Sequence, residues 1–198
     1  MYPFIETIRI ENGQIQNIGY HTERFNRTRA AFWNDVTPID LLQVLNPPTI
    51  PGTQKCRILY RKNIEEITYA SYQMRKVATL RLIHADNIDY TYKSADREEL
   101  NTLFSKREEA DDILIIRNGL LTDTSIANVA LYDGSHWCTP AHPLLLGTKR
   151  AELLHKQFLI EKDIHIFQLG DYSQIMLFNA MIDWEGILIP IQKSNFVL

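Results

Sequence analysis

Three dipeptides that end in glycine constrain the fold of this chain most, because each follows a short run of strand-forming residues. They are Asn12-Gly13, Asn118-Gly119 and Asp133-Gly134. Asn-Gly and Asp-Gly tolerate the positive φ angles of the two-residue turns that join antiparallel strands. The runs before them are rich in isoleucine, leucine and valine, which pack well in sheets. The sequence therefore predicts that sheets with tight turns form a large part of the fold.

Strand-like runs and helical patterns follow one another along the whole chain, without an internal repeat. Strands are predicted at 4–10, 14–18, 56–60, 64–72, 77–83, 113–117, 127–132, 137–139, 164–169, 175–178 and 187–191. Helices are predicted at 21–33, 38–45, 96–110 and 148–162, and loops at 46–52 and 122–125. Asp96 is expected to cap the third helix, with Glu99 at the capping-box position.

This mixture of elements indicates an α+β or mixed α/β fold in two lobes. An N-terminal α/β lobe is expected at 1–86, a connection at 87–92 and a C-terminal lobe at 93–198. With 198 residues and 45% hydrophobic content, the chain is long enough to bury a sizeable core.

Composition argues against several classes of function. The net charge is −3, from 21 basic and 24 acidic residues, without a basic stripe that would indicate nucleic acid or an anionic membrane as a partner. Cys56 and Cys138 lie far apart and are expected to be reduced thiols, and the six histidines lack metal-ligand spacing, so no metal is expected. Without a leader or a long apolar run, the default expectation is a soluble cytoplasmic protein.

Lys93 is the first residue that could carry chemistry. It follows Tyr90-Thr91-Tyr92 and precedes a predicted helix. In a partly buried aromatic setting a lysine loses solvation, its pKa falls, and the free amine becomes a nucleophile. A solvated lysine near a helix start is the alternative that the residue alone leaves open.

Three further features suit a phosphorylated heterocycle. The N–H groups of the helix that follows Gly147 suit a phosphate, Arg24 can pair with a phosphate through two donors, and Asp123 can face a ring nitrogen. Each also has an ordinary structural explanation: a plain helix start, a surface arginine and a polar loop.

The order of these features resembles the class IV aminotransferases, which are enzymes of pyridoxal 5'-phosphate (PLP) fold type IV and include D-amino acid transaminase, branched-chain aminotransferase and 4-amino-4-deoxychorismate lyase. The resemblance runs across most of the chain. It rests on Glu6-Thr7-Ile8-Arg9, His21–Phe25, Lys93, Thr122–Val129, Thr139-Pro140, Leu146–Arg150 and Phe178–Met181.

The resemblance implies a role for each matching residue around the cofactor ring. Lys93 matches the lysine that holds PLP as an imine and later moves the proton. Arg24 matches the arginine of the first helix that grips the cofactor phosphate. Asp123 stands where the family usually has a glutamate beside the pyridine nitrogen, and Asn128 matches the asparagine that closes that motif.

The remaining matches lie on the phosphate side of the cofactor. Thr148 and Lys149, which follow Gly147, match the pair whose backbone N–H groups bind the phosphate. Asn179 and Ala180 match a second pair late in the chain. The family also implies a small-molecule amino substrate and a homodimer.

Three functions are consistent with this resemblance. The first is a lyase like 4-amino-4-deoxychorismate lyase, which releases pyruvate and leaves 4-aminobenzoate for folate synthesis. The second is a branched-chain or D-amino acid aminotransferase that uses 2-oxoglutarate. The third is a truncated PLP-binding paralogue without turnover, since the first strand begins almost at Met1 and Asp123 replaces the usual glutamate.

Overall fold

The computed structural model describes residues 3–197, and their contacts divide the chain into two compact units. The first unit runs to Met74 and also contains Tyr92–Asp96, whereas the second contains Arg75–Thr91 and the chain from Arg97 onward. The chain therefore passes between the units three times. The predicted lobes have a single connection at 87–92, and their limits stay a prediction.

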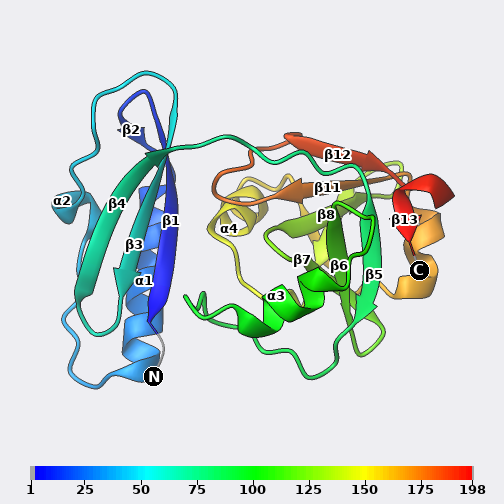
Figure 1. Ribbon diagram of the computed structural model, residues 1–198, viewed down its shortest axis with the longest axis horizontal. Helices are drawn as coiled ribbons and strands as arrows, with labels where there is room; N and C mark the ends of the chain where they lie inside the picture. The colour runs from blue at the N-terminus through cyan, green and yellow to red at the C-terminus, as the bar shows by residue number, and fades with distance from the viewer. Residues whose placement is uncertain (1–2, 198) are drawn as a thin grey trace. The chain divides into compact units, whose positions relative to one another are not determined.

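The first unit is built on a four-stranded antiparallel sheet in the order β2-β1-β3-β4 (Figure 1). Its elements are β1 (Phe4–Glu11), β2 (Gln14–Ile15), α1 (Ile18–Phe32), α2 (Leu41–Val44), β3 (Thr53–Tyr60) and β4 (Ile64–Ser71). The predicted turn between β1 and β2 is confirmed, with φ of 48° at Asn12 and 81° at Gly13.

The core of the first unit forms because apolar residues alternate along its strands. Ile8 and Ile10 of β1 and Ile58 of β3 are fully buried, and Phe25 of α1 packs among them. A period of two in a strand places such residues on one face of the sheet, and α1 covers that face.

The second unit is a larger mixed sheet in the order β10-β9-β8-β7-β6-β5-β13, with β11 paired to β8 and β12 paired to β11. Its strands are β5 (Leu80–His84), β6 (Asp112–Arg117), β7 (Leu120–Thr124), β8 (Asn128–Tyr132), β9 (Trp137–Pro140), β10 (Ile160–Lys162), β11 (Gln174–Phe178), β12 (Ile187–Pro190) and β13 (Phe196–Val197). Its helices are α3 (Glu98–Ser105), α4 (Thr148–His155) and the 3-10 segments η1 (Ile166–Asp171) and η2 (Lys193–Asn195).

Strand β6 is buried on both faces and separates two cores. Ile113 and Ile115 pack with Leu100 of α3, whereas Leu114 and Ile116 face the main core of the unit. A continuous apolar run is what a strand covered on both sides requires. Strand β8 pairs with β11 along its whole length, with β7 at Asn128 and with β9 further on.

Two predicted elements of the second unit are wrong or too long. The predicted helix at 148–162 ends at His155, and Gln157 with φ of 60° turns the chain into β10. The predicted strand at 164–169 is largely the 3-10 segment η1, because the side chain of Gln168 accepts a hydrogen bond from the N–H of His165 and closes a turn.

Two local predictions also need correction. The predicted loop at 122–125 is mostly strand, since β7 continues to Thr124. The predicted cap of the third helix is wrong: α3 begins after Arg97 and no side chain caps it. The N–H of Asp96 instead donates to the hydroxyl oxygen of Ser94 at 3.1 Å, and Asp96 lies outside the helix.

Candidate functional site

The backbone of Lys93 is fixed beside the first strand of its unit. Its carbonyl oxygen accepts the N–H of Ile5 at 2.9 Å, and the next residue, Ser94, forms a bridge with Phe4. The ring of Tyr92 packs 4.7 Å from that of Phe32, measured between centroids. Lys93, itself half-buried, thus extends from a main chain held on both sides.

Arg24, predicted to grip a phosphate, forms a buried network with Glu6 and His21. Its Nε donates to Glu6 Oε1 at 2.9 Å and its Nη2 donates to Glu6 Oε2 at 2.6 Å. Nδ1 of His21 lies 2.6 Å from the same Oε2. Two donors of Arg24 are therefore directed to Glu6, and its role toward a phosphate stays a prediction.

Burial and neighbouring charges have opposing effects on the pKa values of Glu6 and His21. Burial alone would raise the pKa of Glu6, but the charge of Arg24 and the hydrogen bonds from His21 and Arg24 lower it to about 2. Burial lowers the pKa of His21, against the opposing effect of Glu6, and the positive charges of Arg24 and Lys93 lower it further. His21 is thus a neutral imidazole, which we take to donate its Nδ1 hydrogen to Glu6.

Glu6 and His21 were not among the predicted site residues. The signal was present in β1, since Glu6 precedes Ile8 and Ile10 at intervals of two and therefore lies on the buried face. A carboxylate at an apolar position of a strand requires a partner in the core.

Asp123 and Asn128 face each other across β7 and β8. Asp123 Oδ1 accepts from Asn128 Nδ2 at 2.8 Å, and its Oδ2 accepts the N–H of Leu145 at 2.9 Å. Both of these donors are neutral. Burial raises the pKa of Asp123 to about 6, although hydrogen bonds from Leu145 and Asn128 act in the other direction.

Gly147 places the start of α4 directly against Asn128. A Cβ atom on Gly147 would lie 2.0 Å from Asn128 Oδ1, so only glycine fits without a shift. No side chain caps α4, and its first internal bond runs from the N–H of Ala151 to the carbonyl of Gly147 at 3.0 Å. The N–H groups of Thr148 and Lys149 therefore point out of the helix end, as an anion requires.

The ammonium group of Lys149 pairs with two carboxylates. Its Nζ lies 2.9 Å from Glu152 Oε2 and 2.6 Å from Asp183 Oδ1. A role for Lys149 at the helix start would thus come from its backbone, as the resemblance implies.

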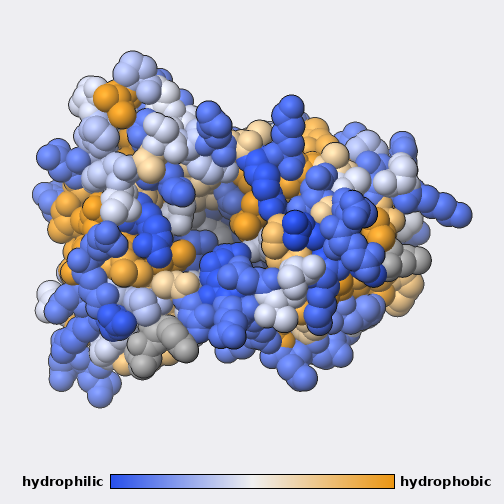
Figure 2. Space-filling model, in the orientation of Figure 1, coloured by the Kyte–Doolittle hydropathy of each residue, from blue (hydrophilic) through white to orange (hydrophobic). Residues whose placement is uncertain are grey.

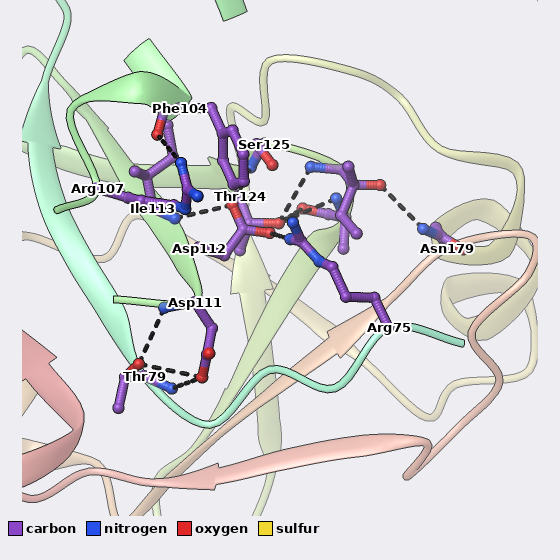
Figure 3. A network of polar contacts seen from close by, with 12 residues as sticks. Arg75, Thr79, Phe104, Arg107, Asp111, Asp112, Ile113, Thr124, Ser125 and Asn179 are labelled. Carbon is purple, nitrogen blue, oxygen red and sulfur yellow. Dashed lines mark hydrogen bonds and ion pairs between the residues drawn. The ribbon is translucent and has the colours of Figure 1, made fainter. Parts of the chain in front are cut away.

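Asn179 and Ala180 lie in the turn that follows β11. Asn179 Oδ1 accepts the N–H groups of Met181 and Ile182 at 2.8 and 2.9 Å, and its Nδ2 donates to the carbonyl of Ile126 at 2.9 Å. The side chain therefore closes its own turn and reaches the loop between β7 and β8 (Figure 3). Contact of this pair with a phosphate stays a prediction.

The loop between β7 and β8 is held by two further side chains. Asp112 Oδ1 accepts the N–H of Ser125 at 3.3 Å, and Arg97 Nη2 donates to the carbonyl of Ser125 at 2.7 Å. Arg75 pairs in turn with Asp112, as Figure 3 shows. No sequence motif indicates this network, because its members are spread from residue 75 to residue 179.

The structure therefore brings Asp123, Asn128 and Gly147 into direct contact within the second unit, with Asn179 bound to the loop beside them. Lys93 and Arg24 belong to the first unit. Within residues 3–197, no cluster of three or more histidine, cysteine, aspartate or glutamate residues is suited to a metal.

Figure 2 shows a face on which hydrophilic residues predominate and hydrophobic ones are interspersed. Among the helices of the described chain, none has the length and apolar character needed to cross a membrane.

Comparison with known proteins finds relatives that are similar over most of this chain. Residues 53–188 match the model of a family described as amino-transferase class IV. An uncharacterized protein of Haemophilus influenzae is 38% identical over 185 residues, which cover 91% of this chain and 98% of that protein. The crystal structure of a proposed 4-amino-4-deoxychorismate lyase from Haemophilus somnus is similar with a TM-score of 0.87 and 36% identity, covering 93% of this chain and 98% of that one.

A more distant structure is similar in fold alone. It is the PLP-bound form of a hypothetical aminotransferase from Mycobacterium tuberculosis, with a TM-score of 0.71 and 14% identity, covering 98% of this chain and 84% of that one.

Proposed function

The chain belongs to the class IV aminotransferase family and has its mixed α/β fold, fold type IV, and on that premise we propose that it is a PLP-dependent lyase resembling 4-amino-4-deoxychorismate lyase. One observation supports the cofactor most. A buried carboxylate with neutral donors, Asp123, is hydrogen-bonded to the segment that leads into an uncapped helix start.

This arrangement fits both the ring nitrogen and the phosphate of PLP. Asp123 is 5% exposed, and a cationic ring nitrogen would supply the positive charge that its neutral donors lack. The outward N–H groups at the start of α4 suit a phosphate dianion, which also gains from the helix dipole. When bound, PLP withdraws electrons from the α-carbon of an amino substrate.

Lys93 is proposed to bind the cofactor covalently through Nζ and to move the proton at the substrate carbon. Its main chain is tied to β1 through Ile5, which limits how far its side chain can shift. The charges of Arg24 and Lys93 also lower the pKa of His21, which disfavours protonation of this imidazole beside Lys93.

The lyase reaction is favoured over the alternatives by the 36% identical structure, which has nearly the same length and is named as a proposed 4-amino-4-deoxychorismate lyase. The substrate would be a small amino compound, with pyruvate and 4-aminobenzoate as products. A branched-chain or D-amino acid aminotransferase that uses 2-oxoglutarate remains the second candidate, because it belongs to the same family. We also propose a homodimer, on the resemblance alone.

Absorbance and chemical trapping test the cofactor. The purified protein, incubated with PLP, should absorb as a yellow imine, and borohydride should fix the cofactor mass on the peptide that contains Lys93. Lys93→Ala should lose both signals, whereas Lys193→Ala, which removes another lysine of the chain, should keep them. Protein that stays colourless with PLP contradicts the cofactor.

Product analysis tests the reaction. With 4-amino-4-deoxychorismate, the holoenzyme should release pyruvate. Conversion of 2-oxoglutarate to glutamate without pyruvate release would instead support the aminotransferase, and the absence of both reactions would support a paralogue without turnover.

A further inference from the structure

Asn128 is in contact with both features that the proposed function assigns to the cofactor, the carboxylate of Asp123 and the start of α4. We propose that Asn128 is a positioning residue that sets the distance between the group facing the ring nitrogen and the N–H groups facing the phosphate. This inference rests on the proposed function and concerns how its two contacts are kept in register.

The side-chain amide of Asn128 donates two hydrogen bonds. Its Nδ2 donates to Asp123 Oδ1 and to the carbonyl of Leu145, in each case at 2.8 Å. The N–H of Leu145 donates to Asp123 Oδ2 at 2.9 Å. Asp123, Asn128 and Leu145 thus form a closed ring of three hydrogen bonds, all of them shielded from water at least in part.

This ring needs two hydrogens from the side chain at position 128. An amide nitrogen carries two hydrogens, and Asn128 directs them to a carboxylate and to a carbonyl, both of which are acceptors. An aspartate would offer neither hydrogen and would add a second negative charge beside Asp123. A leucine would leave both acceptors buried without a donor. The position therefore requires a neutral group with two donors.

Gly147 approaches the side chain of Asn128 closely. Leu145 is two residues before Gly147, and the latter lies so close that a Cβ would be 2.0 Å from Asn128 Oδ1. The nitrogen of the Asn128 amide thus holds the segment before α4, while its oxygen occupies the space beside the first residue of the helix end. A substitution at Asn128 or at Gly147 must therefore shift the other residue.

Asn128 consequently joins two strands, β7 and β8, to a helix that follows about twenty residues later. A displacement of its side chain would release the start of α4 from Asp123 without removing either cofactor contact from the chain. The affinity for the phosphate should then fall more than the affinity for the ring.

The test compares PLP with pyridoxal, which lacks the phosphate. The dissociation constants of both are measured by absorbance titration, and the ratio of the two affinities reports the phosphate contact. In Asn128→Ala this ratio should fall at least tenfold relative to the wild type. Thr139→Val is the matched control, because it also removes a buried side-chain hydrogen bond to a backbone carbonyl in the same sheet, and its ratio should stay within twofold.

A double-mutant cycle tests the link to Gly147. Gly147→Ala alone should lower the ratio at least tenfold, because its methyl group displaces the Asn128 side chain. In the Asn128→Ala background the same substitution has space and should change the ratio less than threefold. If Asn128→Ala does not fold, Asn128→Ser retains one donor and should lower the ratio by a smaller factor.

The outcomes separate this inference from the proposed function. If the wild type binds neither compound, the proposed function fails. If the wild type prefers PLP and Asn128→Ala weakens PLP and pyridoxal equally, or if the effects of Gly147→Ala and Asn128→Ala are additive, the positioning role of Asn128 is overturned while the proposed function stands.

Discussion

Two buried carboxylates, one in each unit, have pKa values that are shifted in opposite directions. Glu6 of the first unit is fully buried and its pKa is lowered to about 2, whereas Asp123 of the second unit is 5% exposed and its pKa is raised to about 6. Burial by itself would raise the pKa of both groups. The difference lies in the donors, because Glu6 has the guanidinium of Arg24 and Asp123 has an amide and a backbone N–H.

This contrast indicates which carboxylate can gain from a ligand. The charge of Glu6 is balanced within the chain, so a cationic ligand would have to compete with Arg24. Asp123 accepts hydrogen bonds from neutral donors, and the charge of Arg150 has the smallest of the effects that lower its pKa, so a ligand that brings a positive charge would lower this pKa further. Similar burial thus produces a structural ion pair in one unit and a candidate ligand group in the other.

The largest expected effect comes from removing the cation of the first unit. Arg24→Met leaves Glu6 buried without its ion-pair partner, which should lower the free energy of unfolding by about 3 to 5 kcal/mol at neutral pH. Arg27→Met is the control, because Arg27 is half-exposed on the same helix and lies 3.7 Å from Glu23; the loss should stay below about 0.5 kcal/mol. Equal losses in urea unfolding of the two variants would contradict the difference between a buried and an exposed pair.

The second largest effect is a pH dependence of the protein's stability, which has the opposite sign for Asp123 and for Glu6. Because its pKa is raised from 3.8 to about 6 in the folded protein, its ionisation costs nothing below pH 3.8 and progressively destabilises the fold up to about pH 6. Relative to Asp123→Asn, the cofactor-free wild type should therefore lose roughly 3 kcal/mol of stability over this range. Glu6 behaves in the reverse sense, since its contribution is complete above pH 4.5 and is lost toward pH 2.

Urea unfolding of the cofactor-free wild type and Asp123→Asn at pH 4, 5, 6 and 7 measures this effect. The difference in stability should change by at most about 1.4 kcal/mol per pH unit, because one group titrates. A stability difference between the two proteins that does not change with pH would show that Asp123 is not destabilised by burial.

The smallest effect is expected at a third buried carboxylate, Asp112, which combines both kinds of partner. It pairs with Arg75, whose side chain is 42% exposed, and it also accepts the N–H groups of Ile113 and Ser125. Arg75→Met should cost only about 1 to 2 kcal/mol, because two neutral donors remain and water can reach the vacated position. A loss as large as that of Arg24→Met would mean that the N–H donors of Asp112 contribute little.

Elements set by neighbouring residues could be predicted from the sequence. The Asn12-Gly13 turn is confirmed because its positive φ angles depend on those two residues. The run at 113–117 is confirmed as β6 because continuous apolar residues fit a strand buried on both faces. The prediction at 164–169 is wrong because a local bond between Gln168 and His165 outweighs a short apolar alternation.

The candidate site was harder to predict, because its contacts join distant segments. The polar residues around Asp123 predict a loop, yet its partner Leu145 is 22 positions away and allows a strand to bury a carboxylate. Glu6 and Arg24, 18 positions apart, likewise find each other only when α1 packs on β1. The resemblance named Arg24 and Asp123, but only the folded structure shows what each one contacts.

The hydrogen bond from Ile5 to the carbonyl of Lys93 has a consequence for how the protein is made. Sequence position 5 acquires this partner only after almost half of the chain has been synthesised, and Phe4 likewise awaits Ser94. On the ribosome, the first unit can form its hairpins early but cannot complete the edge of β1 until the segment that carries Lys93 has emerged. The proposed reactive lysine is therefore among the last parts of its unit to be fixed in place.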